Sequence, residues 1–144
     1  MKELDRIVSK HLGKAGDGSI VNPYVTPDRA DNSLLVPVPR VLNRTEYKID
    51  DDDLPFVGFD SWNCYEVSFL LENGFPVSGV VKLVYPSDSE CIVESKSLKL
   101  YMNSYNMHKM GSTITNAIRN VERKITTDLT EALECEIDVS FHYD

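Results

Sequence analysis

Two neighbouring runs of alternating apolar and polar residues, 62–71 and 75–85, constrain the fold of this chain more than any other feature. In the first run, WNCYEVSFLL, the side chains of Tyr65, Val67 and Phe69 fall on one face and polar side chains fall on the other. A period of two is typical of a β-strand with one buried face. Between the runs, the sequence ENG favours a tight turn. We therefore predict an antiparallel hairpin with Tyr65, Val67 and Phe69 on its buried face.

Helical periods follow the hairpin. From about residue 95, apolar side chains recur at the intervals of three and four that are typical of an amphipathic helix; they are Leu98, Tyr101, Met102 and Tyr105. The sequence NMHKMGS interrupts this pattern, and a second helix is predicted from Ser112 or Thr113. Its apolar stripe contains Ile114, Ala117, Ile118, Val121, Ile125 and Leu129. A period of two returns at 135–143, where it predicts a further strand.

The order of these elements is strand, strand, helix, helix, strand (β-β-α-α-β). We predict an α+β fold in which two helices cover one face of an antiparallel sheet. Residues 1–52 differ in composition, because the first four of the seven prolines lie in NPYVTPDRADNSLLVPVPR and the acidic run Asp50 to Asp53 ends the region. Proline removes a backbone donor and fixes extended geometry. We therefore expect 1–52 to be an extended N-terminal arm and 53–144 to be a single module.

Charge and composition disfavour several classes of function. The 15 basic and 23 acidic residues give a formal net charge of −8, which disfavours binding to nucleic acid or to acidic membranes. No stretch approaches the roughly 20 apolar residues of a membrane span, and the N-terminus has no apolar signal region. We expect a cytoplasmic protein without a membrane partner. Three cysteines and three histidines are scattered without metal-ligand spacing, so we expect reduced thiols and no metal site.

The segment VESKSLKLY, 93–101, allows two interpretations. If a helix begins at residue 95 or 96, its free backbone N–H groups and the Lys96 ammonium favour a phosphate or a carboxylate. The Glu94 carboxylate would then be able to accept hydrogen bonds from a guanine-like N–H edge. Equally, serine and glutamate occur at helix starts, and lysines cover solvated helix faces, without any ligand. The residues alone leave both interpretations open.

Longer motifs bear on this choice. The sequence ESKSLKLYMNSYN resembles the signature of the QueF family, the NADPH-dependent nitrile reductases that convert 7-cyano-7-deazaguanine to 7-aminomethyl-7-deazaguanine for queuosine in tRNA. SLLVPVPRVLNR (33–44), DLPFVGFDSWNCYEVSFL (53–70) and NGFP (73–76) are similar to the N-terminal module of the family's two-module members. The motifs follow the family's order, and the resemblance covers most of the chain from about residue 33 onward.

The resemblance implies a tunnelling fold (T-fold), which is also the fold of GTP cyclohydrolase I and urate oxidase. In that fold, sheets join edge to edge into barrels, and planar heterocycles bind at the interfaces between modules. A fourth strand is not evident in this sequence, so we expect the N-terminal arm or a partner to complete the sheet. Unpaired strand edges also favour an oligomer over a monomer.

The resemblance also implies binding residues. Val93, Glu94 and Ser95 correspond to the segment that contacts the deazaguanine, with Glu94 paired to the donor edge of the base. Ser95 and Lys96 correspond to the residues that contact NADPH, with Lys96 neutralising a phosphate. We therefore expect the substrate and the cofactor to meet at this segment.

Catalytic residues do not carry over. Nitrile reduction needs a thiolate that attacks the nitrile carbon to form a thioimide, and an acid that supplies protons. Aligning NGFPV with the family's Gly-x-Pro-Asp turn places Leu70 and Val77 at the cysteine and aspartate positions. Cys64 and Cys91 do not match the nucleophile, and His108 lies too early to match the family's His-Glu pair. The family's Arg-Gly cofactor contact also has no counterpart. We therefore predict that no residue of this chain is catalytic.

These observations favour the substrate- and NADPH-binding half of a nitrile oxidoreductase. A partner chain or a missing C-terminal module would supply the cysteine and the aspartate, and this chain alone would be inactive. A homo-oligomer is the alternative assembly. A different function that stays open is a non-catalytic module with the same fold, which binds a deazapurine or supports assembly. Another deazapurine-handling activity, such as an amidotransfer, is less favoured because it also needs the missing thiolate.

Overall fold

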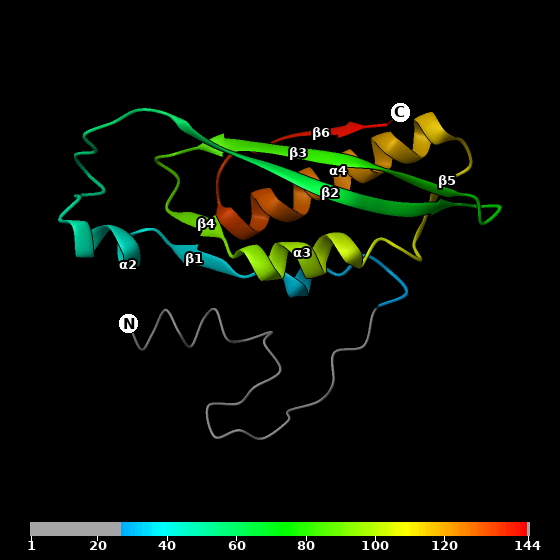
Figure 1. Cartoon of the computed structure of the whole chain (residues 1–144), viewed down its shortest axis with the longest axis horizontal. Coiled ribbons are helices and arrows are strands. Elements are labelled where there is room, and N and C mark those ends of the chain that lie inside the picture. The colour runs from blue at the N-terminus through cyan, green and yellow to red at the C-terminus, as the bar shows by residue number, and fades with distance from the viewer. Residues whose placement is uncertain (1–26, 144) are drawn as a thin grey trace, which may run out of the picture.

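The computed structural model describes residues 27–143 (Figure 1). The strands in this range are β1 (Pro37–Pro39), β2 (Phe59–Leu71), β3 (Pro76–Pro86), β4 (Cys91–Val93), β5 (Lys109–Gly111) and β6 (Asp138–His142). The α-helices are α2 (Val41–Arg44), α3 (Ser95–Asn103) and α4 (Ile114–Leu133). Two short 3-10 helices, η2 (Asn32–Leu34) and η3 (Thr45–Tyr47), flank β1 and α2.

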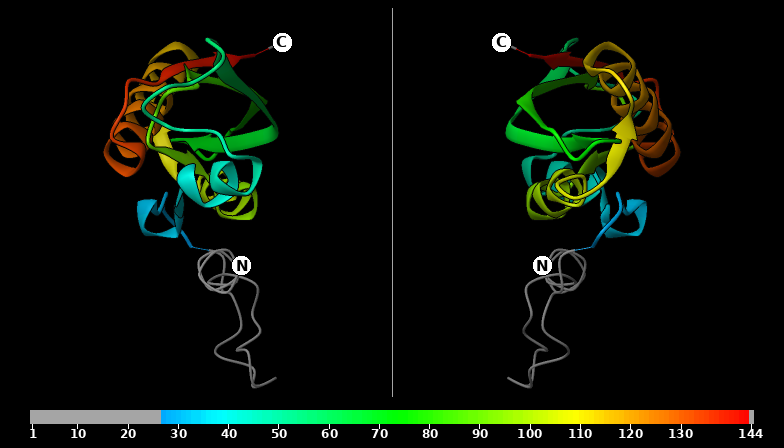
Figure 2. Two further views of the ribbon diagram at one scale, coloured as in Figure 1. Left: turned by 90° about the vertical axis from the view of Figure 1, so that its left-hand side faces the viewer. Right: turned by 90° about the vertical axis from the view of Figure 1, so that its right-hand side faces the viewer.

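Four strands form one sheet in the order β5-β2-β3-β6. β2 and β3 are the predicted antiparallel hairpin, with Trp62 opposite Leu83 and Phe69 opposite Val77. β6 pairs antiparallel with the other edge of β3. α3 and α4 contribute side chains to the same core as these strands, and Figure 2 shows both helices on one side of the curved sheet. The predicted α+β class is therefore confirmed.

The fourth strand of the sheet comes from the segment between α3 and α4. β5 runs parallel to β2, with Leu70 opposite Lys109. The Leu70 amide donates to the His108 carbonyl oxygen over 2.9 Å, and the Glu72 amide donates to the Gly111 carbonyl oxygen over 2.9 Å. The prediction that the arm or a partner completes an antiparallel sheet is wrong, because the fourth strand comes from the segment between α3 and α4 and pairs in parallel at one edge of the sheet. A strand of three residues is too short to reveal a period of two.

α4 is the second predicted helix. Thr113 caps its N-terminus, because the Asn116 amide donates to the Thr113 Oγ1 over 3.2 Å. The helix ends at Leu133, and its C-cap, Glu134, has a φ of 53° in the left-handed region. Its buried stripe fills the core beneath the sheet with Ala117, Val121, Ile125, Leu129 and Leu133. Both the start of this helix and its buried face agree with the sequence prediction.

The alternation of β2 reverses at a bulge. The register with β3 shifts between Cys64 and Val67, and Glu66 has a φ of 59°, in the left-handed region. Val67 and Phe69 are buried as predicted, but Tyr65 is 72% exposed. The prediction that Tyr65 shares their face is therefore wrong. One extra residue in a strand moves the earlier side chains to the opposite face, and Cys64 packs partly against the core instead.

Residues 32–47 of the predicted arm contain short elements that pack against the module. β1 pairs antiparallel with β4, and the Glu94 amide donates to the Val36 carbonyl oxygen over 2.9 Å. Val36 and Val38 are buried. This part of the arm has more regular structure than its prolines suggested, because β4 supplies hydrogen-bond partners. Residues 1–26 of the predicted arm lie outside the described range, and the division into arm and module stays a prediction.

Asp128 on α4 is the centre of a buried polar cluster between the two long helices. The Tyr101 hydroxyl donates to the Asp128 carboxylate over 2.6 Å, and the Lys124 ammonium lies 3.1 Å from the same carboxylate. The Tyr101 and Tyr105 hydroxyls are 2.7 Å apart. Each polar side chain of this cluster therefore has a partner, as burial in a core requires. The cluster fixes how α3 lies against α4.

Gly79 marks the closest approach of β3 to β6. A Cβ atom at this position would lie 2.3 Å from the His142 carbonyl oxygen and 2.7 Å from the Phe141 ring. We predict that Gly79→Ala lowers the free energy of unfolding by about 1–3 kcal/mol, the usual cost of overpacking. Gly58→Ala is the control, because the nearest atom to its added Cβ is 4.0 Å away. Urea unfolding measures both variants, and equal stabilities would contradict the close approach.

His108 makes the docking of the arm sensitive to pH. The Ala30 amide donates to the His108 Nδ1 over 3.0 Å, so protonation of that nitrogen breaks the hydrogen bond. Burial lowers the pKa of His108 below its ordinary value of 6.5; the Lys124 and Arg29 cations add to this effect and Asp28 opposes it. The unfolded chain therefore takes up the proton more readily than the folded chain. The stabilisation is present above about pH 6.5 and is lost as the pH falls through the lower folded-state pKa.

The free energy of unfolding at closely spaced pH values below neutrality measures this effect. We predict that the stability of the wild type falls with acidification in this window, and that the stability of His108→Gln falls less. His142→Gln is the control and should keep the pH dependence of the wild type. The same pH dependence in all three proteins would rule out a role for His108 in docking the arm.

Candidate functional site

The segment from Glu94 to Ser97 forms the N-terminus of α3. Glu94 is extended, with φ −69° and ψ 132°, and its carboxylate accepts hydrogen bonds from the Lys96 amide over 2.9 Å and the Ser97 amide over 2.6 Å. The Ser97 hydroxyl donates to the Glu94 carbonyl oxygen over 2.8 Å. Glu94 is therefore the N-cap, and the helix begins at Ser95, within the predicted range.

The cap changes what this end of the helix is able to bind. One of the two expectations from the sequence was that free backbone N–H groups attract an anion, but the Glu94 carboxylate already accepts from two of them. That expectation is wrong for these two amides, because a carboxylate of the chain itself satisfies them. The Lys96 side chain is exposed and forms no ion pair with any residue in the range 27–143. Lys96 and the exposed Ser95 hydroxyl remain suited to a phosphate.

The predicted substrate-binding residues differ in exposure. The Val93 side chain lies in the core and is only 1% exposed. Glu94 is half-buried, and its two carboxylate oxygens keep lone pairs for further donors. The structure thus brings Glu94, Ser95 and Lys96 together at one end of α3 and directs the Val93 side chain inward. Their roles in binding stay predictions.

A cavity of about 520 Å³ lies between β2 and α3. Aromatic, amide, hydroxyl, charged and apolar side chains line it: Trp62, Asn63, Cys64, Tyr65, Glu66, Ser68, Ser95, Leu98, Lys99, Met102, Asn103 and Asn106. This volume and this mixed lining are typical of small-molecule sites. Of the four predicted binding residues, Ser95 lines the cavity, so the cavity adjoins the N-terminus of α3.

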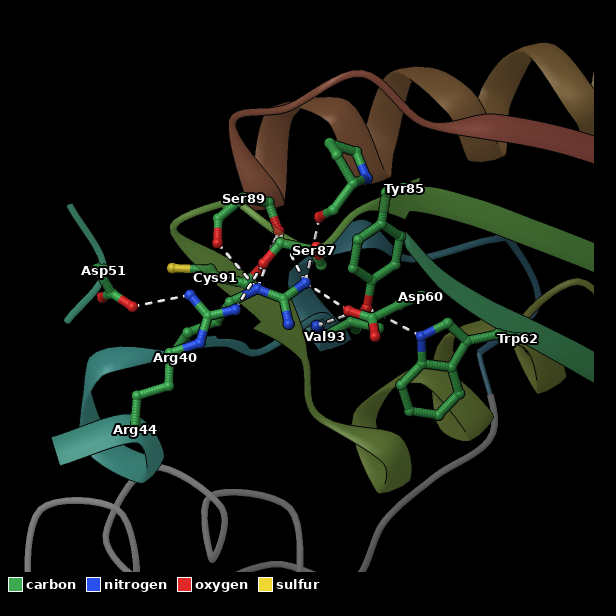
Figure 3. A network of polar contacts seen from close by, with 11 residues as sticks. Arg40, Arg44, Asp51, Asp60, Trp62, Tyr85, Ser87, Ser89, Cys91 and Val93 are labelled. Carbon is green, nitrogen blue, oxygen red and sulfur yellow. Dashed lines mark hydrogen bonds and ion pairs between the residues drawn. The ribbon is translucent and has the colours of Figure 1, made fainter. Parts of the chain in front are cut away.

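Arg40 joins the arm to the sheet beside these residues (Figure 3). Its Nε donates to the Ser89 carbonyl oxygen over 2.8 Å, and its Nη2 donates to the Ser89 hydroxyl over 3.0 Å and pairs with Asp60. The guanidinium carbon lies 5.9 Å from the centre of the Tyr85 ring. The Arg40 side chain is buried, so these partners compensate for removing its charge from water. Arg40 therefore fixes β2 relative to the loop between β3 and β4.

The Tyr85 hydroxyl connects this network to the predicted site. The Trp62 Nε1 donates to it over 2.9 Å, and the Val93 amide lies 3.5 Å from it (Figure 3). Burial raises the pKa of Tyr85, so the hydroxyl is protonated at neutral pH. Trp62 also lines the cavity. A chain of polar contacts therefore runs from the cavity wall to the residue that precedes Glu94.

The cysteines are thiols rather than thiolates at neutral pH. Burial raises the pKa of the Cys64 thiol to about 11. Burial, together with the Glu90 and Glu134 carboxylates, raises the pKa of Cys91, and burial also raises the pKa of Cys135. The thiolate is the nucleophilic form of cysteine. The expectation that this chain has no catalytic residue stays a prediction, and these protonated thiols are consistent with it.

Three further observations bear on the chemistry of the described range. Leu70 and Val77, at the predicted cysteine and aspartate positions, lie opposite Pro76 and Phe69 in the hairpin. Within residues 27–143, no group of three or more His, Cys, Asp or Glu side chains is placed to hold a metal ion. No helix in this range is both long enough and apolar enough to cross a membrane.

Sequence reasoning missed Arg40, Asp60 and Glu66. Arg40 and Asp60 lie in the motifs at 33–44 and 53–70, but no periodicity marks a buried ion pair between two separate segments. The available signal was an arginine directly after an apolar run, VPVPR. Glu66 has the alternation of a solvated strand residue, and neither the bulge at this position nor the cavity beside it shows in a pattern of two.

Replacing Arg40 tests whether its planar fork holds the network together. Lysine keeps the charge but has a single nitrogen, which is unable to reach Ser89 and Asp60 with the same geometry. We predict that Arg40→Lys lowers the free energy of unfolding by about 1.5–3 kcal/mol, the usual contribution of hydrogen bonds to a charged group. It should also shift the emission of Trp62, because the network includes the partner of its indole.

The exposed Arg119 on α4 provides the control. Arg119→Lys should change neither the unfolding free energy nor the emission of the single tryptophan. Urea unfolding and tryptophan fluorescence measure both variants. An Arg40→Lys protein as stable as Arg119→Lys would show that the planar guanidinium of Arg40 is not needed for the stability of the fold.

Comparison with known proteins relates this chain to one family. Residues 26–141 match the family described as nitrile reductase, 7-cyano-7-deazaguanine-reductase N-term. The chain is 44% identical over 110 residues to the NADPH-dependent 7-cyano-7-deazaguanine reductase of Rickettsia canadensis (strain McKiel), an overlap that covers 76% of this chain and 38% of that protein. It is 37% identical over 143 residues to the protein of the same name from Legionella pneumophila (strain Paris), with 98% of this chain and 47% of that protein covered.

The chain therefore spans less than half the length of these curated relatives. The matched residues include Arg40, the cavity and the start of α3. The resemblance that the motifs of the sequence indicated is confirmed. The chain belongs to the family of 7-cyano-7-deazaguanine nitrile reductases and corresponds to their N-terminal part.

Proposed function

We propose that this chain is the substrate- and NADPH-binding half of a nitrile oxidoreductase that reduces 7-cyano-7-deazaguanine to 7-aminomethyl-7-deazaguanine in the queuosine pathway. The observation that carries the proposal is the match of residues 26–141 to the N-terminal part of this reductase family. The catalytic cysteine and aspartate come from a partner chain or from a second module. The reaction serves biosynthesis of a modified nucleoside, so we place the protein in the cytoplasm.

The substrate contacts lie at the start of α3. Val93, Glu94 and Ser95 contact the heterocycle, and the Glu94 carboxylate accepts from its N–H edge. Two amide donors hold this carboxylate in a fixed orientation, and a carboxylate has room for further donors on the same oxygens. A cap that is already ordered loses little entropy when the base binds. The cap therefore supports the role of Glu94.

The cofactor contacts use the neighbouring side chains. NADPH supplies hydride when it is bound, and Ser95 and Lys96 of this chain hold it. The fit rests on an exposed ammonium without an ion-pair partner in the described range and on an exposed hydroxyl beside it. These groups suit a phosphate, whereas the amides of Lys96 and Ser97 are taken by Glu94. The phosphate is therefore bound by side chains rather than by the helix backbone.

We further propose that the module adopts the tunnelling fold and works as part of an oligomer. The outer edges of β5 and β6 are not paired with any strand in the described range. Open edges favour pairing with another chain, either a second copy or a catalytic partner. An interface there would allow residues of two chains to meet at one site. The unpaired edges support this assembly.

Replacing Lys96 tests the cofactor contact. We predict that Lys96→Ala weakens the binding of NADPH about tenfold or more, because an ion pair to a phosphate contributes about 1.5–3 kcal/mol. Lys109→Ala is the control, because Lys109 is exposed and lies on β5 rather than on α3. Isothermal titration calorimetry measures both affinities. If the wild type binds 7-cyano-7-deazaguanine without any affinity for NADPH, the alternative of a non-catalytic deazapurine-binding or assembly module replaces this proposal.

Incubation with substrate and cofactor tests whether the chain is only half of an enzyme. We predict no covalent adduct with 7-cyano-7-deazaguanine in intact-mass spectrometry and no consumption of NADPH by the purified chain, because its thiols are protonated. Cys64→Ser identifies the nucleophile should an adduct form. An adduct or steady turnover by the chain alone would show that one of its own cysteines is catalytic.

A further inference from the structure

The bulge in β2 forms one wall of the cavity. Glu66 has a φ of 59°, a conformation that costs a residue other than glycine about 1–3 kcal/mol. Such strain persists only where the surrounding structure imposes it, and bulges often re-aim side chains beside binding sites. Tyr65 and Glu66 lie within the register shift of this bulge, and both line the cavity.

Several polar groups of the cavity have no partner inside the described structure. Asn63, Glu66 and Asn103 line the cavity, and none of their side chains forms a hydrogen bond or an ion pair with another residue in 27–143. In contrast, the Ser68 hydroxyl donates to the Asn106 Oδ1 over 2.9 Å. Glu66 is an acceptor, and the two amides are both donors and acceptors. The cavity therefore presents a set of hydrogen-bonding groups that a ligand is able to satisfy.

The other walls suit a flat ring. Trp62 and Tyr65 are aromatic, and the buried side chains of Leu98 and Met102 add apolar surface from α3. Aromatic and apolar walls with a few placed polar groups are typical of heterocycle sites. Glu66 and Lys99 are the charged residues in the lining, so their formal charges cancel. These features favour a neutral heteroaromatic base with N–H donors over a polyanion.

We propose that this cavity binds the heterocycle of the 7-deazaguanine substrate, with Glu66 accepting from an N–H edge of the base and Asn63 completing the hydrogen bonds. This inference rests on the proposed function and extends it to β2. Ser95 lines the same cavity, so a base bound there reaches the predicted Val93–Ser95 segment. The Glu94 carboxylate already accepts from two amides, whereas the Glu66 carboxylate accepts no hydrogen bond from any residue in 27–143. In this arrangement, the Glu94 and Glu66 carboxylates accept from two different N–H groups of one base.

Titration of the full chain with 7-cyano-7-deazaguanine tests this assignment. Trp62 is the single tryptophan and lines the cavity, so its emission should change as the base binds. We predict that Glu66→Gln weakens the affinity for the base about tenfold or more, because a neutral amide oxygen replaces the charged acceptor. Glu72→Gln, at an exposed position beyond the end of β2, is the matched control and should bind like the wild type. NADPH affinity, measured by calorimetry, should stay unchanged in both variants.

Three results would overturn the assignment: a base that does not bind the wild type, binding that leaves the Trp62 emission unaltered, or equal affinities of Glu66→Gln and the wild type. A base titration that depends on Glu66, combined with no binding of NADPH, would support the cavity and reject the proposed cofactor role. Circular dichroism checks that Glu66→Gln is folded. Should it unfold, Asn63→Ala replaces it, and this variant must bind the base more weakly than the wild type.

Discussion

The position of the site depends on the buried guanidinium of Arg40. A charge at that depth is stable only where several acceptors converge on it, and here they come from β2 and from the loop between β3 and β4. The arm, the central hairpin and β4 are thereby fixed relative to one another. Because β4 leads directly into α3, the same contacts determine where Glu94 and Lys96 lie. The N-terminal end of α3, where we propose that ligands bind, is thus positioned by the contacts of Arg40.

The long elements were predictable from periodicity, and the short ones were not. The hairpin and α4 repeat their pattern often enough to define both the element and its buried face. β5 has three residues, and β1 gains its partner from a distant segment, so neither has a pattern of its own. Tyr65 is exposed because the bulge adds one residue to β2. This extra residue moves every earlier side chain of the strand to the opposite face, and the alternating pattern of the sequence does not reveal it.

Only part of the candidate site was predictable from the sequence. The start of α3 followed from local chemistry, since Glu94 and Ser95 favour a helix start. The same residues predict both an anion site and a cap, and the hydrogen bonds to the Lys96 and Ser97 amides show that the cap is present. The bulge at Glu66 arises from pairing between whole strands, so single-residue preferences were unable to predict it. Motif resemblance identified the family, but the cavity itself needed the fold.

The pairing of β1 with β4 also has a consequence for the order in which the chain folds. Pro37 and Val93 are partners, and the whole β2–β3 hairpin lies between them in the sequence. Closing so long a loop costs entropy before any contact repays it, whereas the hairpin contacts are local. We expect the hairpin to form early and the β1–β4 ladder to form late. A nascent chain would therefore form the hairpin before the β1–β4 ladder fixes the start of α3.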